Sequence, residues 1–338
     1  YMVAAGFVLY MAEQKKQEVR VMKNKSLGFS IAGSILIILF MLFINYTTSP
    51  GFPWFIYPVF AALWWPIGVY TAKKGGGAFI AIAGPVLSIA FFAAVNLTTS
   101  PGFLWFIFPV FGVLWWPLGY FLGRRIKSFT VIGSLLLIAF FFLVNLMTGF
   151  GHPWFIYPVF GVIWWPLAVF FGKGRAKLFS VLGFLLSAAF FVIVNLVTSP
   201  GHPWFIYPVF GAIWWPLAIF FGKSRPKLFS ILGFLLISGF FIIVNLITSP
   251  GHLWFIHPVF ATAWWPLSLL LAKKTTIKGY SLTAAIMTIA YLILVNILVS
   301  PGVWWCLYAL FPLLLWPALM YMEKLAASLP VAVIGSLA

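Results

Sequence analysis

The sequence predicts an all-α, polytopic transmembrane protein of six tandem two-helix hairpins, with about 12 membrane-spanning helices. Three observations predict this fold: a lipid-facing composition, a motif that recurs six times, and basic residues that collect between apolar runs. Hydrophobic residues make up 64% of the 338 residues, and charged residues make up only 7%. Soluble domains carry about 25% charged residues because their surface faces water, so this composition excludes a soluble fold.

An asparagine ends each of six apolar runs and marks the repeat. A Pro-Gly pair follows in five copies, as in Pro50-Gly51, and Phe150-Gly151 replaces it in the third copy. Later in five copies comes a Trp-Trp-Pro segment, such as Trp64-Trp65-Pro66. These repeat asparagines lie 49 to 51 residues apart and are Asn45, Asn96, Asn145, Asn195, Asn245 and Asn296. Self-similarity at a fixed period predicts a repeat architecture.

Each copy divides into two helices joined by a turn. In the first copy we expect helices over about residues 27–45 and 54–72, with a turn between them. A helix of about 19 residues spans nearly 30 Å, the thickness of the hydrocarbon core. The predicted divisions are 1–25 (the end of a preceding helix and a basic cytoplasmic linker), hairpins at 26–74, 75–127, 128–177, 178–227, 228–278 and 279–324, and the start of a further helix at 325–338.

The charged residues are unbalanced and unevenly placed. The chain has 20 Lys and Arg residues but only three carboxylates, Glu13, Glu18 and Glu323. The turns after the repeat asparagines carry no Lys or Arg. The loops between hairpins carry Lys73, Lys74, Arg124, Arg125, Lys127, Lys173, Arg175, Lys177, Lys223, Arg225, Lys227, Lys273, Lys274 and Lys278.

The positive-inside rule places these basic loops and both ends of the chain in the cytoplasm. We therefore expect a multi-pass protein of the cell membrane. Membrane lipids are the expected partners, with anionic headgroups at the basic loops. Protein partners in a membrane complex are a further expectation, and nucleic acid is not expected.

The repeat asparagine has two interpretations that the sequence leaves open. One is a cap of the first helix in the left-handed conformation, which Asn tolerates better than most residues. The other is an amide that faces a ligand in an outward pocket.

The prolines of the second helix also have two interpretations. A proline inside a helix frees the carbonyl four residues earlier, and in lipid that carbonyl needs a partner. Prolines such as Pro58 and Pro66 either bend the helix or help to line a cavity. Stacked tryptophans also suggest an apolar cofactor as an alternative, although no cofactor is predicted. The candidate lining residues are Trp64, Pro66, Trp115, Pro117, Trp164, Pro166, Trp214, Pro216, Trp264, Pro266 and His257.

Three histidines occupy the same position in three successive turns: His152, His202 and His252. They are candidate metal ligands if neighbouring turns converge. Phe52 and Phe103 hold this position in the first two copies, which favours an interfacial polar residue and no metal site. His257 replaces a tyrosine found in other copies, so we expect it to keep a hydrogen-bonding role.

The repeat resembles the bacterial 2TM domain family. The resemblance covers every copy and is clearest from Val244 to Gly251 and at Trp254-Phe255. It implies a helical hairpin of the kind found beside helix-turn-helix or histidine-kinase modules. This chain departs from the family in having six hairpins, no soluble signalling module, and Trp-Trp-Pro where the family has a Trp-Gly pair.

The residues that are missing narrow the function. No carboxylate lies between Leu27 and Met322, so coupling to protons or sodium is not expected. The sequence shows no paired carboxylates and no Ser-His-Asp set, so an enzyme is not expected. We expect a non-enzymatic scaffold, assembly partner or sensor module in a larger membrane complex. The alternatives are a transporter or channel for a neutral or anionic small solute, and a membrane protein that binds an apolar cofactor.

Overall fold

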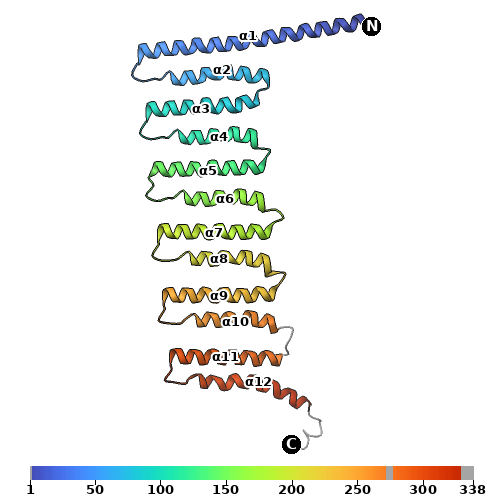
Figure 1. The fold of residues 1–338 in the computed structure, drawn as a ribbon, viewed down its shortest axis with the longest axis vertical. Helices are drawn as coiled ribbons and strands as arrows, with labels where there is room; N and C mark the ends of the chain where they lie inside the picture. The colour runs from blue at the N-terminus through green and yellow to red at the C-terminus, as the bar shows by residue number, and fades with distance from the viewer. Residues whose placement is uncertain (1, 272–276, 329–338) are drawn as a thin grey trace, which may run out of the picture. The chain divides into compact units, whose positions relative to one another are not determined.

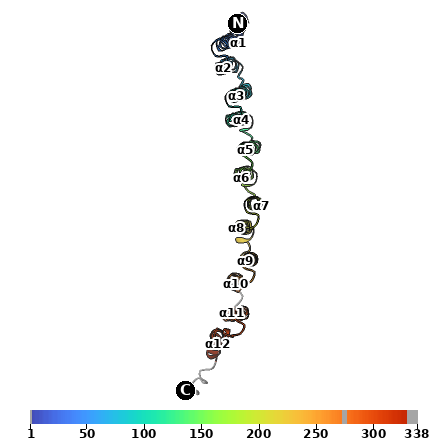
Figure 2. The ribbon, with the colours of Figure 1, turned by 90° about the vertical axis from the view of Figure 1, so that its left-hand side faces the viewer.

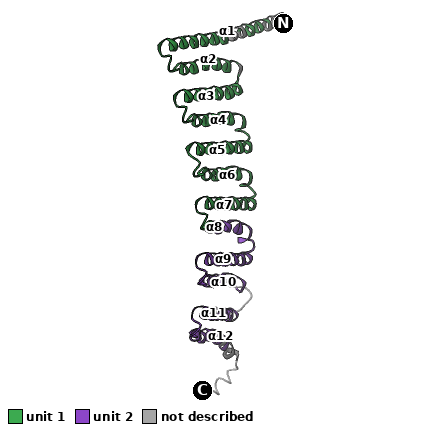
Figure 3. Ribbon diagram, turned by 60° about the vertical axis from the view of Figure 1, so that its left-hand side comes forward, with its two compact units in different colours: residues 1–205 green, residues 206–338 purple. Residues whose placement is uncertain are grey.

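The computed structural model describes residues 2–271 and 277–328. These residues form helices joined by short connections, and no strand occurs among them. The chain divides into two compact units, residues 1–205 and residues 206–338 (Figure 3). The all-α class predicted from the sequence is confirmed.

Unit 1 is a row of helices in sequence order. It holds α1 (Met2–Thr48), α2 (Ile56–Lys74), α3 (Gly77–Thr99), α4 (Ile107–Leu122), α5 (Ile126–Thr148), α6 (Ile156–Phe171) and α7 (Ala176–Thr198). The pairs α1·α2, α3·α4 and α5·α6 pack as antiparallel hairpins, and α2·α3, α4·α5 and α6·α7 join each hairpin to the next helix. Within this unit the helices lie in a single layer (Figure 1, Figure 2).

Unit 2 continues the same pattern. It holds α8 (Ile206–Leu217), the π-helical turn η1 (Ala218–Gly222), α9 (Pro226–Thr248), α10 (Ile256–Leu271), α11 (Ile277–Val299) and α12 (Cys306–Ser328). The pairs α9·α10 and α11·α12 are hairpins, η1 packs on α9, and α10 packs on α11. The fourth predicted hairpin is divided between the units, with α7 ending unit 1 and α8 beginning unit 2.

Six helices are long and apolar enough to cross a membrane. Among the described residues these are 26–48, 77–99, 126–148, 176–198, 226–248 and 279–299. They are the first helices of the six copies, so a multi-pass membrane protein agrees with the fold. The helices α4, α6 and α10 have only 16 residues each. Helices of this length span about 24 Å, less than the thickness of the hydrocarbon core.

The N-terminal segment differs from the expected linker. Residues 2–25 are helical and continue into the first span, so α1 has 47 residues. The stretch from Glu13 to Lys25 contains no Gly or Pro and is rich in Glu, Gln, Lys, Arg and Met. These residues are good helix formers, which explains the continuous helix. At the other end, residues 325–328 belong to α12, and residues 329–338 lie outside the described part of the chain.

The two prolines of each second helix are not equivalent. Pro66 lies inside α2, whereas Pro58 is the third residue of this helix. An N–H in the first turn has no partner within the helix, so proline is tolerated there. The carbonyl that Pro58 would leave free belongs to Trp54, and it accepts the N–H of Tyr57 at 3.3 Å. The expectation of two bends in each second helix is therefore wrong for the Pro58 position.

Candidate functional site

The repeat asparagine holds each turn together with its side-chain amide. In the first turn, Asn45 Nδ2 donates to the carbonyl oxygens of Ser49 and Phe52 at 2.7 and 2.9 Å. Its Oδ1 accepts the backbone N–H of Phe55 at 3.1 Å. The other five asparagines make the same three bonds. One buried side chain thus satisfies three backbone groups of the turn that have no partner in a helix.

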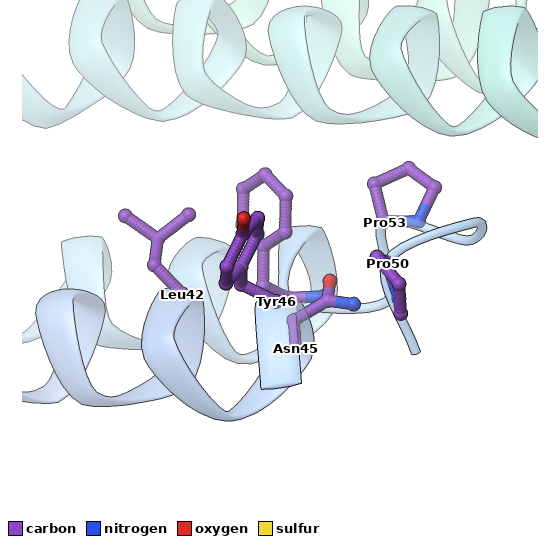
Figure 4. A pocket seen from close by; sticks show the side chains of 6 residues that line it. Leu42, Asn45, Tyr46, Pro50 and Pro53 are labelled. Carbon is purple, nitrogen blue, oxygen red and sulfur yellow. The ribbon is translucent and has the colours of Figure 1, made fainter. Parts of the chain in front are cut away.

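This geometry differs from the left-handed cap that the sequence suggested. Asn45 lies inside α1, which continues to Thr48, and no described residue other than glycine has a positive φ. The amide points toward the turn that carries Pro50 and Pro53 (Figure 4). A shallow pocket of about 180 Å³ lies beside it, with Leu42 in its wall. Because both amide atoms already bond the turn, Asn45 has little capacity left for a ligand.

The Trp-Trp pair packs on a glycine of a first helix. A Cβ built on Gly84 would lie 2.7 Å from Trp116 of its own hairpin and 3.1 Å from Trp64 of the preceding hairpin. Gly133 would meet Trp165 and Trp115 in the same way. We call these residues the notch glycines; the described set is Gly33, Gly84, Gly133 and Gly233. One tryptophan of a pair therefore joins the two helices of its own hairpin, and the other joins successive hairpins.

Neighbouring hairpins are also joined by a pair of stacked aromatic rings. In the first such pair, Phe60 and Phe91 lie 4.1 Å apart between ring centroids, and Tyr57 packs edge-on against Phe91 at 5.9 Å. We call the stacked pair the clasp. The other clasps have centroid distances of 3.9 to 4.1 Å and are Phe111–Phe140, Phe160–Phe190, Phe210–Phe240 and Phe260–Tyr291. Stacked and edge-on aromatic pairs add about 0.5–1.5 kcal/mol each to area burial.

His257 belongs to the last of these interfaces. Its Nδ1 lies 2.6 Å from the hydroxyl oxygen of Tyr291, and the two groups share a hydrogen bond. In the preceding interfaces between hairpins, a tyrosine or phenylalanine at this position packs edge-on against a clasp phenylalanine, as Tyr207 does against Phe240. The two rings keep the edge-on contact, with centroids 6.0 Å apart, and the two substitutions add a hydrogen bond to it. This contact joins two hairpins and does not by itself form a ligand site.

A freed carbonyl finds a partner in the first hairpin. Pro66 leaves the carbonyl of Ala62 without a helical donor, and Ser34 Oγ donates to this oxygen at 2.7 Å. Ser134 holds the equivalent position in the third hairpin, where its buried Oγ has no hydrogen-bond partner. The carbonyl that Pro66 frees therefore faces the interface between α1 and α2, and the buried hydroxyl of Ser134 makes no hydrogen bond.

The remaining candidate lining residues also lie along helix interfaces. Trp164 packs on Phe179, and Trp264 packs on Phe260. Trp214 reaches the notch glycine of the fifth hairpin. The later prolines, Pro117, Pro166, Pro216 and Pro266, lie inside second helices.

The three turn histidines are not brought together. No group of three His, Cys, Asp or Glu side chains that could hold a metal occurs among the described residues. His152 is exposed, and its Nε2 lies 3.4 Å from the hydroxyl oxygen of Tyr157 in α6. The convergence on which the metal hypothesis depended is therefore not seen.

The basic loops lie at the end of the hairpins opposite to the asparagine turns. In unit 1 the connections at 75–76, 123–125 and 172–175 share one end of the row (Figure 1). Lys127 also places its Nζ 5.5 Å from the ring centroid of Phe170. Lys273 and Lys274 lie outside the described residues, and the side chain of Lys278 is not described.

Sequence reasoning missed the small residues of the first helices, both the notch glycines and the residues three positions before them. Each first helix carries a small residue three positions before the notch position, and the six residues are all fully buried: Ser30, Ala81, Thr130, Ser180, Ser230 and Ser281. The signal was present, because small residues that recur near one another on a membrane helix permit close helix approach. No family model, curated protein or solved structure matches the chain.

Proposed function

We propose that the protein is a non-enzymatic membrane scaffold, a series of helical hairpins that presents its broad apolar faces to partner helices and lipids. One observation carries this proposal. In each unit, the packed helix pairs among the described residues are neighbours in sequence. A helix that packs only on its two neighbours leaves two faces open, as the single layer of each unit shows (Figure 2). Repeat proteins use such extended surfaces for binding.

The exposed side chains support this reading. One position of the first helix faces outward in every copy, with exposures of 51 to 61%, and is held by Ile35, Val86, Leu135, Leu185, Leu235 and Ile286. The recurring polar groups have the opposite placement, because the repeat asparagines are at most 4% exposed and bond their own turns. The outward faces are thus apolar, as a surface for lipid or partner helices requires.

The proposal includes 12 crossings, with the basic loops in the cytoplasm. The turns at 49–55 and the loops at 75–76 lie at opposite ends of the hairpins, which supports a return of each second helix through the membrane. Their short helical length is extended by the aromatic turn that precedes them. Single cysteines at Lys177 and Gly201 would test this on intact cells after Cys306 has been replaced by serine. Labelling from outside is expected at Gly201 only, and equal labelling of both positions would refute the topology.

The scaffold role is tested at the outward position. A photoreactive phenylalanine analogue at Val86 or Leu135 should give protein adducts of discrete mass in native membranes. The same analogue at Phe111, whose ring stacks on Phe140 of this chain at 4.1 Å, serves as the control. Adducts to lipid alone at every outward position would contradict a scaffold.

A conduit for a neutral or anionic solute remains the second candidate. The unpaired buried hydroxyls of Ser134 and Ser238 favour it, because polar groups without partners are costly in lipid. Proteoliposomes loaded with a dye or a labelled solute should show no flux beyond empty vesicles if the scaffold proposal holds. Flux that disappears in Ser134→Ala would replace the scaffold by a conduit.

Two further alternatives are a signalling role, as the resemblance to the 2TM family implies, and the binding of an apolar cofactor. The cofactor would lie on the stacked tryptophans. Each tryptophan described above already packs on a glycine or an aromatic ring of this chain, which gives the cofactor reading little support. Pigment or quinone that copurifies in a fixed ratio with the chain would argue for it.

A further inference from the structure

The third hairpin, formed by α5 and α6, gathers basic residues from two connections at one of its ends. Its helices run antiparallel, so the start of α5 and the end of α6 lie together (Figure 1). The position of Lys127 Nζ, 5.5 Å from the ring centroid of Phe170, shows this closeness directly. The connection before α5 and the connection after α6 therefore flank the same end. We call their cations the basic end: Arg124, Arg125, Lys127, Lys173 and Arg175.

The chain supplies no nearby anion to balance the basic end. All five side chains are exposed. The sequence has no carboxylate between Leu27 and Met322, so no residue of the neighbouring helices can form an ion pair with them. A cluster of one sign of charge raises the local concentration of ions of the opposite sign. The basic end therefore fits an anionic ligand.

Exposed aromatic rings lie beside these cations, in the last turns of α4 and α6. Tyr120 is 53% exposed, Phe121 is 46% exposed, and Phe170 is 37% exposed. Tyr120 and Phe121 come directly before the connection that carries the two arginines, and α4 packs on α5. Aromatic rings at the end of a membrane helix lie at the level of the headgroups. The site thus combines cations with apolar surface, as an amphiphilic ligand requires.

The connection between the first two hairpins lacks this combination. It carries Lys73 and Lys74 but no arginine, and glycines occupy 75–77. An arginine binds a phosphate through two parallel hydrogen bonds, whereas a lysine acts as a point charge. The third hairpin therefore differs in chemistry from a loop that only attracts the membrane surface.

We propose that the basic end binds one anionic phospholipid, with the headgroup phosphate held by its arginines and lysines and an acyl chain along Phe121 and Phe170. Basic clusters at the ends of membrane helices bind anionic headgroups in this way. A free phosphate ion would use the cations alone and leave the exposed rings without a role. The inference goes beyond the proposed scaffold role, because it requires no protein partner. Failure of either proposal would leave the other unaffected.

Native mass spectrometry of the full-length chain in mild detergent tests the proposal. The chain, supplied with equal amounts of phosphatidylglycerol and phosphatidylcholine, should retain one phosphatidylglycerol in preference to phosphatidylcholine. Arg125→Gln with Lys173→Gln should lower this retention about tenfold or more, because each basic residue near an anionic headgroup contributes about fivefold to binding. Both residues are exposed in connections, so the variant should fold. Arg125→Lys with Lys173→Arg keeps both charges and should recover most of the retention.

The matched control is Lys15→Gln with Lys16→Gln, which removes the same net charge from an exposed part of α1. This control should leave the retention unchanged. An equal loss in the control and in the Arg125 and Lys173 variant would show that net charge alone attracts the lipid, and the proposal would fall. Equal retention of the two lipids by the unsubstituted chain would also overturn it.

Two further measurements locate the ligand and identify its source. Phosphatidylglycerol with a photoreactive acyl chain should form adducts on peptides that contain Phe121 or Phe170, and adducts spread evenly over outward positions such as Leu135 would refute the site. Inorganic phosphate at millimolar concentration should not displace the lipid. Displacement, together with uptake of phosphate by the lipid-free chain, would assign the cations to a soluble anion and overturn the lipid proposal.

Discussion

The third and fourth turns have nearly the same sequence, Thr-Gly-Phe-Gly-His-Pro-Trp at 148–154 and Thr-Ser-Pro-Gly-His-Pro-Trp at 198–204, yet they close differently. In the fourth turn the N–H of Ser199 bonds the Asn195 carbonyl at 2.8 Å, and the N–H of His202 bonds the Ser199 carbonyl at 3.2 Å. Neither bond forms in the described third turn. The amide of Asn145 also lies farther from its two carbonyl partners, at 3.2 and 3.1 Å.

The difference arises at two residues. Gly149 has φ +104°, a conformation that glycine adopts without steric cost, whereas Ser199 has φ −155°. Phe150 replaces proline, and its ring packs on Phe155 at a centroid distance of 6.1 Å. The third turn has thus exchanged two backbone hydrogen bonds for an aromatic contact. The comparison teaches that the asparagine tolerates a variable turn as long as its three partners remain within reach.

The largest expected effect comes from replacing the amide by a carboxylate. Asn195→Asp keeps the shape but places a second acceptor against two carbonyl oxygens in a buried site. The carboxylate would keep one donor, the N–H of Phe205, and would repel the two carbonyl oxygens, and a buried charge satisfied so poorly costs about 3 kcal/mol or more. Denaturant unfolding in lipid–detergent mixtures should show this loss, and a smaller loss for Asn145→Asp, whose bonds are longer. Equal losses in the two turns would mean that the difference in bond length has no energetic meaning.

Glycine at the third turn should resist substitution more than serine at the fourth. Gly149→Ala forces a side chain into a positive-φ conformation and should cost about 1–2 kcal/mol. Ser199→Ala should change the free energy of unfolding by less than about 0.5 kcal/mol, because the bonds of Ser199 described above use its backbone. Thermal melts of the two variants side by side would check this. A more harmful Ser199→Ala would show that its hydroxyl matters.

Exchanging the turn sequences should transfer their properties. Gly149→Ser with Phe150→Pro converts the third turn into the sequence of the fourth. Two regained backbone bonds and the fixed φ of proline should stabilise it by about 1 kcal/mol. Amide hydrogen exchange at residue 152 should slow in this double variant. If its exchange stays fast, the aromatic contact of Phe150 was the better arrangement in this hairpin.

The smallest effect is expected from the turn histidines. The repeat asparagine bonds the backbone oxygen at this position, as in the pair Asn195 and His202, and not the imidazole. His152→Phe and His202→Phe should therefore shift the free energy of unfolding by less than about 0.5 kcal/mol. Addition of zinc should leave the melting temperature of the unsubstituted protein unchanged. A zinc-dependent rise that both substitutions abolish would revive the metal hypothesis.

Sequence reasoning located the helices and the turns but not the environment of their residues. The spacing of the asparagines and the apolar runs between them are local features, so helices and turns could be located from them. The Trp-Trp pair was noticed but not its partner, because Trp116 and Gly84 lie 32 residues apart. Pro58 was misplaced because a shift of a few residues in the helix start separates a first-turn proline from an interior one.

The sequence by itself determined that this is an all-helical, repetitive chain with an apolar surface, since composition and period depend on no distant contact. Only the tertiary structure decided which face of each helix meets the next hairpin. That choice depends on notch and clasp residues that pack across hairpins, such as Gly84 with Trp64 and Phe91 with Phe60. In lipid every face of such a helix is apolar, so hydrophobic patterning does not distinguish the packed face from the open one, and shape complementarity makes the selection.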